Sequence, residues 1–82
     1  MKDIFAKRIK HYRRREDLTQ EEFAIKIGIS PQSVSKWERG VTYPDITLIS
    51  DICKVLDVTE HELIEAGNDF EYHEIKRTAK KY

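Results

Sequence analysis

The chain has 82 residues, of which 37% are charged and 39% are hydrophobic, and its formal net charge is zero. A chain of this length forms one small domain, whose limited core depends on close packing of its elements. The single Cys53 cannot form an internal disulfide, and the sequence contains neither an apolar run of membrane-spanning length nor a secretory signal. We therefore expect a cytoplasmic protein with no membrane segment.

The charges are distributed unevenly along the chain. Residues 1–40 carry ten Lys or Arg against six acids, net +4, and residues 41–75 carry one Lys against nine acids, net −8. Residues 76–82 add four cations and no acid, net +4. The N-terminal half is therefore the expected polyanion-facing side, although a zero total by itself argues weakly against nucleic acid.

Apolar residues recur at three- and four-residue steps, and Gly and Pro are scarce, so the pattern predicts an all-α fold. A first helix is expected over residues 2–15, with Phe5, Ile9 and Tyr12 facing the core. Five cations are expected largely outside that apolar stripe: Lys7, Arg8, Lys10, Arg14 and Arg15. The first helix should thus be basic outward and apolar inward.

A second helix begins at a T-x-x-E capping box formed by Thr19 and Glu22. Gly28 supplies the left-handed residue that ends it and turns the chain sharply. Its inner face consists of Phe23, Ala24 and Ile27.

The third and fourth helices also carry start and stop signals. Ser30 caps the third helix, Pro31 occupies its first turn, where no amide hydrogen is needed, and Gly40 ends it. Pro44 stiffens the following loop, and Asp45 is the expected cap of the fourth helix. The apolar stripe of that helix is Leu48, Ile49, Ile52 and Leu56.

A second T-x-x-E box, Thr59 to Glu62, starts a fifth helix that Gly67 should end. Leu63 and Ile64 are its inward residues. We expect residues 1–67 to form the domain. Residues 68–82 are either a helix that needs a partner or a charged tail, and a further C-terminal domain would follow such a linker.

Two short helices joined by a tight turn lie between Gln20 and Glu38, which is helix-turn-helix spacing. Three residues suit close packing of these helices: Ala24, Gly28 and Val34. The chain resembles the phage-repressor-like (XRE-type) helix-turn-helix family over about residues 5–66, through the motifs "LTQEEFAIKIGIS", "SVSKWERG" and "YPDITLISDICKVLDVTEHELI". This resemblance implies a compact five-helix domain that binds double-stranded DNA.

The third helix has a mixed outer face. Steps of 100° per residue place Val34 and Trp37 on one side. Opposite them, with Ser35 beside the group, lie Gln32, Lys36 and Arg39. Such amide and cationic groups read purine edges or hold phosphate. Ordinary solvation also explains a polar outer face on a short helix, but the turn, the caps and the basic first helix together favour DNA reading.

The resemblance assigns Gln20 to a phosphate contact, and Gln32, Ser33 and Lys36 to reading or anchoring in the groove. Pro31 replaces the polar residue often found at its position, so no base contact is expected there. Further phosphate contacts are expected from five residues: Lys10, Arg14, Arg15, Ser35 and Arg39. Simple solvation is the alternative for the three on the first helix.

Arg13 lies on the inward stripe of the first helix, where an unpaired charge is costly. In the family the corresponding Arg pairs with an acid near the end of the third helix, here Glu38. Trp37 and Cys53 are interpreted as core residues rather than as a base-stacking group and a nucleophile. The three His residues are scattered, so we expect no metal and no cofactor.

The leading hypothesis is a transcriptional regulator, a repressor, that binds a twofold operator as a homodimer. Its dimer surface would use apolar groups of the fifth helix and the tail: Leu63, Ile64, Phe70 and Ile75. The rival is a protein-interaction module whose acidic second half docks a basic partner. The sequence offers no nucleophile, base and oxyanion group arranged on a cleft, so we do not expect an enzyme.

Overall fold

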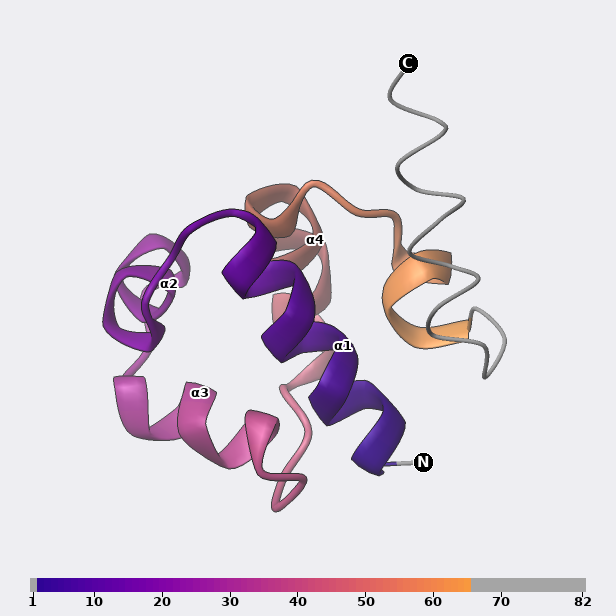
Figure 1. The fold of residues 1–82 in the computed structure, drawn as a ribbon, viewed down its shortest axis with the longest axis horizontal. Helices are drawn as coiled ribbons and strands as arrows, with labels where there is room; N and C mark the ends of the chain where they lie inside the picture. The colour runs from indigo at the N-terminus through magenta and orange to yellow at the C-terminus, as the bar shows by residue number, and fades with distance from the viewer. Residues whose placement is uncertain (1, 66–82) are drawn as a thin grey trace.

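The computed structural model describes residues 2–65, which form α1 (Lys2–Arg15), α2 (Gln20–Ile27), α3 (Pro31–Glu38), the 3-10 turn η1 (Ile46–Leu48), α4 (Ile49–Leu56) and the π-helical turn η2 (His61–Glu65). In Figure 1, α1 crosses the centre of the molecule, with α2 and α3 on its left and η2 on its right. The expected all-α class with five helices is confirmed, and η2 is the fifth. The predicted stop at Gly67, the domain boundary there and the tail 68–82 lie outside the described residues.

The core lies where one face of each helix meets the others. Its buried members are Phe5, Ile9, Tyr12, Phe23, Ala24, Val34, Trp37, Ile52, Cys53, Leu56, Val58 and Leu63. Because Leu63 is 0% exposed, it belongs to this core, and its assignment to a dimer surface is wrong. Ile64 is 47% exposed and remains available for such a contact. Phe70 and Ile75 lie outside the described residues.

Both predicted capping boxes are present. At the start of α2, the Thr19 hydroxyl accepts from the Glu22 amide at 3.0 Å, and the Glu22 carboxylate accepts from the Thr19 amide at 2.9 Å. Thr59 and Glu62 make the same pair of bonds before η2, at 3.0 and 2.8 Å. Each box satisfies two backbone amides that a helix start leaves without partners.

Four helix ends turn through a left-handed residue. Gly28 (φ +85°) ends α2 and Gly40 (φ +74°) follows α3, as their positions in the sequence predict. Asp17 (φ 60°) and Asp57 (φ 58°) play the same part after α1 and α4. These two turns are not predicted from the sequence, because Asp is a weaker signal for this conformation than Gly.

The predicted cap at Asp45 belongs to η1, which begins three residues before α4. Its carboxylate accepts from the Thr47 amide and from the Thr47 hydroxyl, each at 2.9 Å. These bonds hold the pKa of Asp45 below its usual value. Asp45 therefore caps η1, and η1 runs directly into α4.

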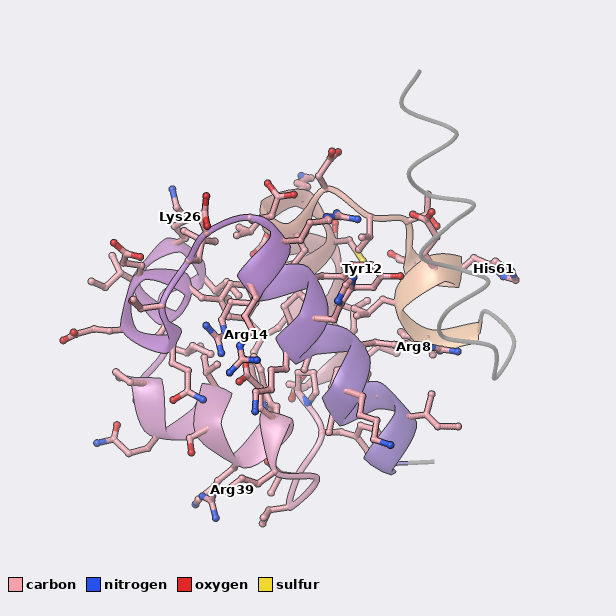
Figure 2. The ribbon with its side chains drawn as sticks, viewed as in Figure 1. Arg8, Tyr12, Arg14, Lys26, Arg39 and His61 are labelled. Carbon is pink, nitrogen blue, oxygen red and sulfur yellow. The ribbon has the colours of Figure 1, made fainter. Side chains whose placement is uncertain are left out.

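Arg8 and Arg15 are expected on the outward face of α1, but both bond to other elements of the protein. Arg8 is only 3% exposed, and its Nη1 donates to the carbonyls of Leu63 and Ile64, at 3.3 Å each. Arg15 Nη2 donates to the Leu56 carbonyl at 2.8 Å. Both arginines therefore donate to carbonyl groups at or near the ends of other elements of the fold. Figure 2 shows Arg8 on the side of α1 that faces η2.

Candidate nucleic-acid interface

The α3 helix is oriented by two buried residues. Val34 and Trp37 are buried in the core, and α3 packs against both α1 and α2. Gln32, Lys36 and Arg39, which the sequence places on the opposite face, are all exposed. The structure thus sets an amide and two cations on one outward face, as the 100° spacing predicts.

The start of α3 is fixed by the expected cap. The Ser30 hydroxyl accepts from the Ser33 amide at 3.2 Å, and Pro31 occupies the first helical turn. The two serine hydroxyls also lie 3.1 Å apart, within hydrogen-bonding distance. Ser33, a predicted base contact, is half-buried, so its hydroxyl stands at the edge of the outward face and already has a partner.

The end of α3 holds two predicted phosphate residues together. Arg39 Nε donates to the Ser35 hydroxyl at 3.1 Å, one turn back along the helix. This bond leaves the terminal nitrogens of the guanidinium with their hydrogens for other acceptors. In Figure 2, Arg39 extends from the side of α3 that faces away from α1.

The predicted pair of Arg13 and Glu38 is present and joins α1 to α3. Arg13 Nε lies 2.6 Å from Glu38 Oε2, and Arg13 Nη2 lies 2.9 Å from Glu38 Oε1. Their side chains are 9% and 3% exposed. Arg13 Nη1 also donates to the Leu18 carbonyl at 2.6 Å. The pair is therefore a buried, two-bonded ion pair that holds α3 against the scaffold.

The Glu38 carboxylate has a further partner that the sequence does not predict. Gln20 Nε2 donates to Glu38 Oε1 at 3.0 Å, which links α2 to the same group. Gln20 is the first residue of α2 and is half-buried. No spacing rule predicts this bond, because residues 20 and 38 meet only through the packing of two helices. The predicted phosphate residue is thus already held on one side by the protein.

The remaining cations of the predicted site belong to α1. Lys10 and Arg14 are exposed, as is Lys7 one turn earlier, so these three form the solvent-facing stripe of the helix. Figure 2 shows Arg14 on the side of α1 that faces α2 and α3, opposite the side of Arg8. The predicted phosphate residues therefore fall into three groups, with Gln20 at the start of α2, the cations Lys10 and Arg14 on α1, and the bonded pair of Ser35 and Arg39 at the end of α3.

The described part of the chain gives little support for a metal site, a reactive thiol or a membrane-spanning helix. Residues 2–65 contain no group of three or more His, Cys, Asp or Glu side chains placed to hold a metal ion. Burial raises the pKa of the Cys53 thiol to about 11, with Glu60 and Glu62 adding to the effect. This thiol stays protonated near neutral pH, in keeping with its predicted place in the core. Over the same range, no helix combines the length and the apolar character needed to cross a membrane.

Known proteins match this chain over the same elements. The helix-turn-helix family model HTH_3 matches residues 9–63. Antitoxin PezA of Streptococcus pneumoniae is 38% identical over 61 residues, which are 74% of this chain and 39% of PezA. The HTH-type transcriptional regulator SinR of Bacillus subtilis is 33% identical over 70 residues, 84% of this chain and 63% of SinR. The chain thus spans less than two thirds of either relative.

A solved structure shares both the fold and part of the sequence. The structure described as a SinR protein/SinI protein complex aligns with a TM-score of 0.72 and 31% identity, over 93% of this chain and 78% of that one. The residues that the family model matches, 9–63, include the turn between α2 and α3.

Proposed function

Because this chain belongs to the HTH_3 (XRE-type) helix-turn-helix family, we propose that it is a transcriptional regulator that binds double-stranded DNA sequence-specifically, with α3 in the major groove. One observation carries the proposal. Val34 and Trp37 bury one face of α3, and the opposite face exposes Gln32, Lys36 and Arg39. A helix held in this way presents donors and acceptors to base edges without rearrangement of the backbone.

Each base-reading residue has a distinct role in this proposal. The Gln32 amide suits the N6 and N7 edge of adenine, since it both accepts and donates. The Lys36 ammonium suits the O6 and N7 edge of guanine or an adjacent phosphate. Ser33, at the edge of the face, contacts either a base or the backbone.

Phosphate contacts hold α3 in register on the duplex. The amides at the start of α2 and the Gln20 side chain form one anion site, and the Ser35–Arg39 pair forms a second at the end of α3. Lys10 and Arg14 add positive charge from α1. Because each cation that neutralises a phosphate releases a counterion, binding should weaken steeply with salt.

One recognition helix reads too little DNA for a unique site, so we propose a homodimer on a twofold operator, with half-sites about 34–36 Å apart. Among the residues expected at that contact, Ile64 lies in the described part of the chain and is exposed. We propose further that the protein acts as a repressor in the cytoplasm and that a C-terminal domain follows this one.

Random-site selection on duplex DNA, at about 50 and about 200 mM salt, tests this function. We expect an enriched motif with twofold symmetry and a half-site spacing of one helical turn. Affinity should fall linearly with salt on logarithmic axes, with a slope near −0.9 for each phosphate neutralised. Recovery of random sequences at both concentrations would contradict the proposal.

A protein-interaction module is the second candidate. The zero net charge of the chain favours it, as does the exposed position of four acids in the second half of the described chain: Asp45, Asp51, Asp57 and Glu60. The solved structure that resembles this chain is described as a complex of the relative SinR with another protein, SinI. In this candidate the outer face of α3 is only solvated. Duplex affinity that is weak and independent of sequence at both salt concentrations would favour it.

A further inference from the structure

The carboxylate of Glu38 joins three helices. It accepts from Arg13 of α1 through two bonds, and from Gln20 of α2 through a third, at 3.0 Å. Its own side chain, at the end of α3, is 3% exposed. The bond from Gln20 satisfies a further lone pair of this buried carboxylate, and it also ties the start of α2 to the ion pair.

The bond to Glu38 fixes which end of the Gln20 amide points inward. A carboxylate accepts hydrogen bonds and cannot donate them, so Nε2 and not Oε1 must face it. The Nε2 group carries two hydrogens, and one is taken by Glu38. The second hydrogen and Oε1 remain. Gln20 is half-buried and is the first residue of α2, so its side chain starts at the helix end whose first backbone amides have no partner within the helix.

We propose that Glu38 is a positioning residue, which holds the Gln20 amide so that its second N–H meets a DNA phosphate at the start of α2. This inference rests on the proposed function, because the phosphate belongs to the duplex that α3 reads. Arg13 has a second part in the arrangement. Its guanidinium neutralises Glu38 in the interior, so the carboxylate orients Gln20 without repelling the phosphate.

A double-mutant cycle in DNA affinity separates positioning from simple packing. The variants are Gln20→Ala, Arg13→Met with Glu38→Met, and all three changes together, with Ile25→Ala as control, since Ile25 is 73% exposed on the same helix. Replacing both members of the ion pair removes the acceptor without leaving a buried charge. We expect Gln20→Ala to weaken binding about tenfold on every duplex sequence. In the background without the ion pair the same change should weaken binding less than about twofold. Equal losses in both backgrounds would overturn the proposal.

A second measurement does not depend on DNA or on the stability of the Glu38 variant. The side-chain amide of Gln20 can be followed by nuclear magnetic resonance in the free wild-type protein. We expect an order parameter near the value of about 0.85 that is typical of rigid backbone. A value below about 0.6 would show a freely moving side chain and would overturn the positioning role. If this amide is rigid and the wild type binds no duplex, the proposed function fails while the positioning contact stands.

Discussion

The two sides of α1 both carry basic residues, but these residues make different contacts. On the side of α4 and η2, Arg8 and Arg15 donate to backbone carbonyls at or near the ends of those elements. Toward α3, Arg13 is buried against a carboxylate, and Lys10 and Arg14 are exposed. The first side bonds to the ends of α4 and η2, and the second holds and flanks α3.

This difference shows why a count of cations is a poor guide to a polyanion-binding surface. Residues 1–40 contain ten Lys or Arg, yet Arg8, Arg13 and Arg15 are engaged within the protein. The charge available to phosphate is therefore smaller than the composition implies. Substitutions of the residues engaged within the protein should change its stability. Substitutions of exposed residues on α1 and α3 should change its affinity for DNA.

The largest effect is expected from Glu38→Ala, which leaves the buried guanidinium of Arg13 without its acid. Loss of one partner of a buried ion pair costs about 3–5 kcal/mol in the free energy of unfolding. Urea denaturation measures this change, with the exposed Glu21→Ala as the matched control. A loss below about 1 kcal/mol, the size typical of surface pairs, would mean that the pair does not hold α3 in place.

Arg8→Met should also destabilise the protein, because the carbonyls of Leu63 and Ile64 lose a buried donor. We expect a loss of about 1–3 kcal/mol in the free energy of unfolding. Lys7→Met, at the exposed neighbouring position, is the control and should change it by less than about 0.5 kcal/mol. The salt dependence of DNA binding should be the same for wild type and Arg8→Met, since this cation does not face phosphate. A shallower slope would place Arg8 in the interface.

Gln32→Ala and Lys36→Ala should weaken DNA binding rather than folding. Each change should cost about 1–3 kcal/mol of binding free energy and relax the preference at one or two base pairs. Melting temperatures should stay near that of the wild type, because both side chains are exposed. Affinity lost equally on all sequences would reassign these residues to the DNA backbone.

Arg14→Ala tests the exposed side of α1. We expect its free energy of unfolding to stay within about 0.5 kcal/mol of the wild type. The slope of log affinity against log salt should become shallower by about 1, the loss of one phosphate contact. Titrations at several salt concentrations measure the slope, and urea denaturation measures the stability. A slope equal to that of the wild type would show that Arg14 is merely solvated.

The smallest expected effect has the opposite sign. Glu22→Gln keeps the capping box at the start of α2 but removes a negative charge beside the proposed phosphate site. We expect DNA affinity at low salt to rise by about 0.3–1 kcal/mol, while helix stability falls by a similar or smaller amount. Weaker binding by this variant would mean that no phosphate approaches the start of α2.

Local signals in the sequence predicted much of the fold. The bounds of α1, both capping boxes and the two glycine turns follow from hydrophobic periodicity and from the chemistry of helix ends. The left-handed turns at Asp17 and Asp57 were missed, since aspartate adopts that conformation only when the rest of the chain requires it.

Contacts between distant segments were harder to predict. The pair of Arg13 and Glu38 was predicted because a charge on an apolar stripe needs a partner, and the family resemblance named that partner. The roles of Arg8 and Gln20 were not predicted, because their acceptors lie 55 and 18 residues away and meet them only through helix packing. The base-reading residues themselves stay a prediction.

Chemical-shift mapping of backbone amides during titration with duplex DNA tests most directly which face of the molecule meets DNA. We predict that the largest changes fall on residues 31–39 and at Gln20 and Glu21, with small changes over α4. Changes concentrated on α4 and η2, with residues 31–39 unaffected, would contradict the assignment of α3 as the recognition helix.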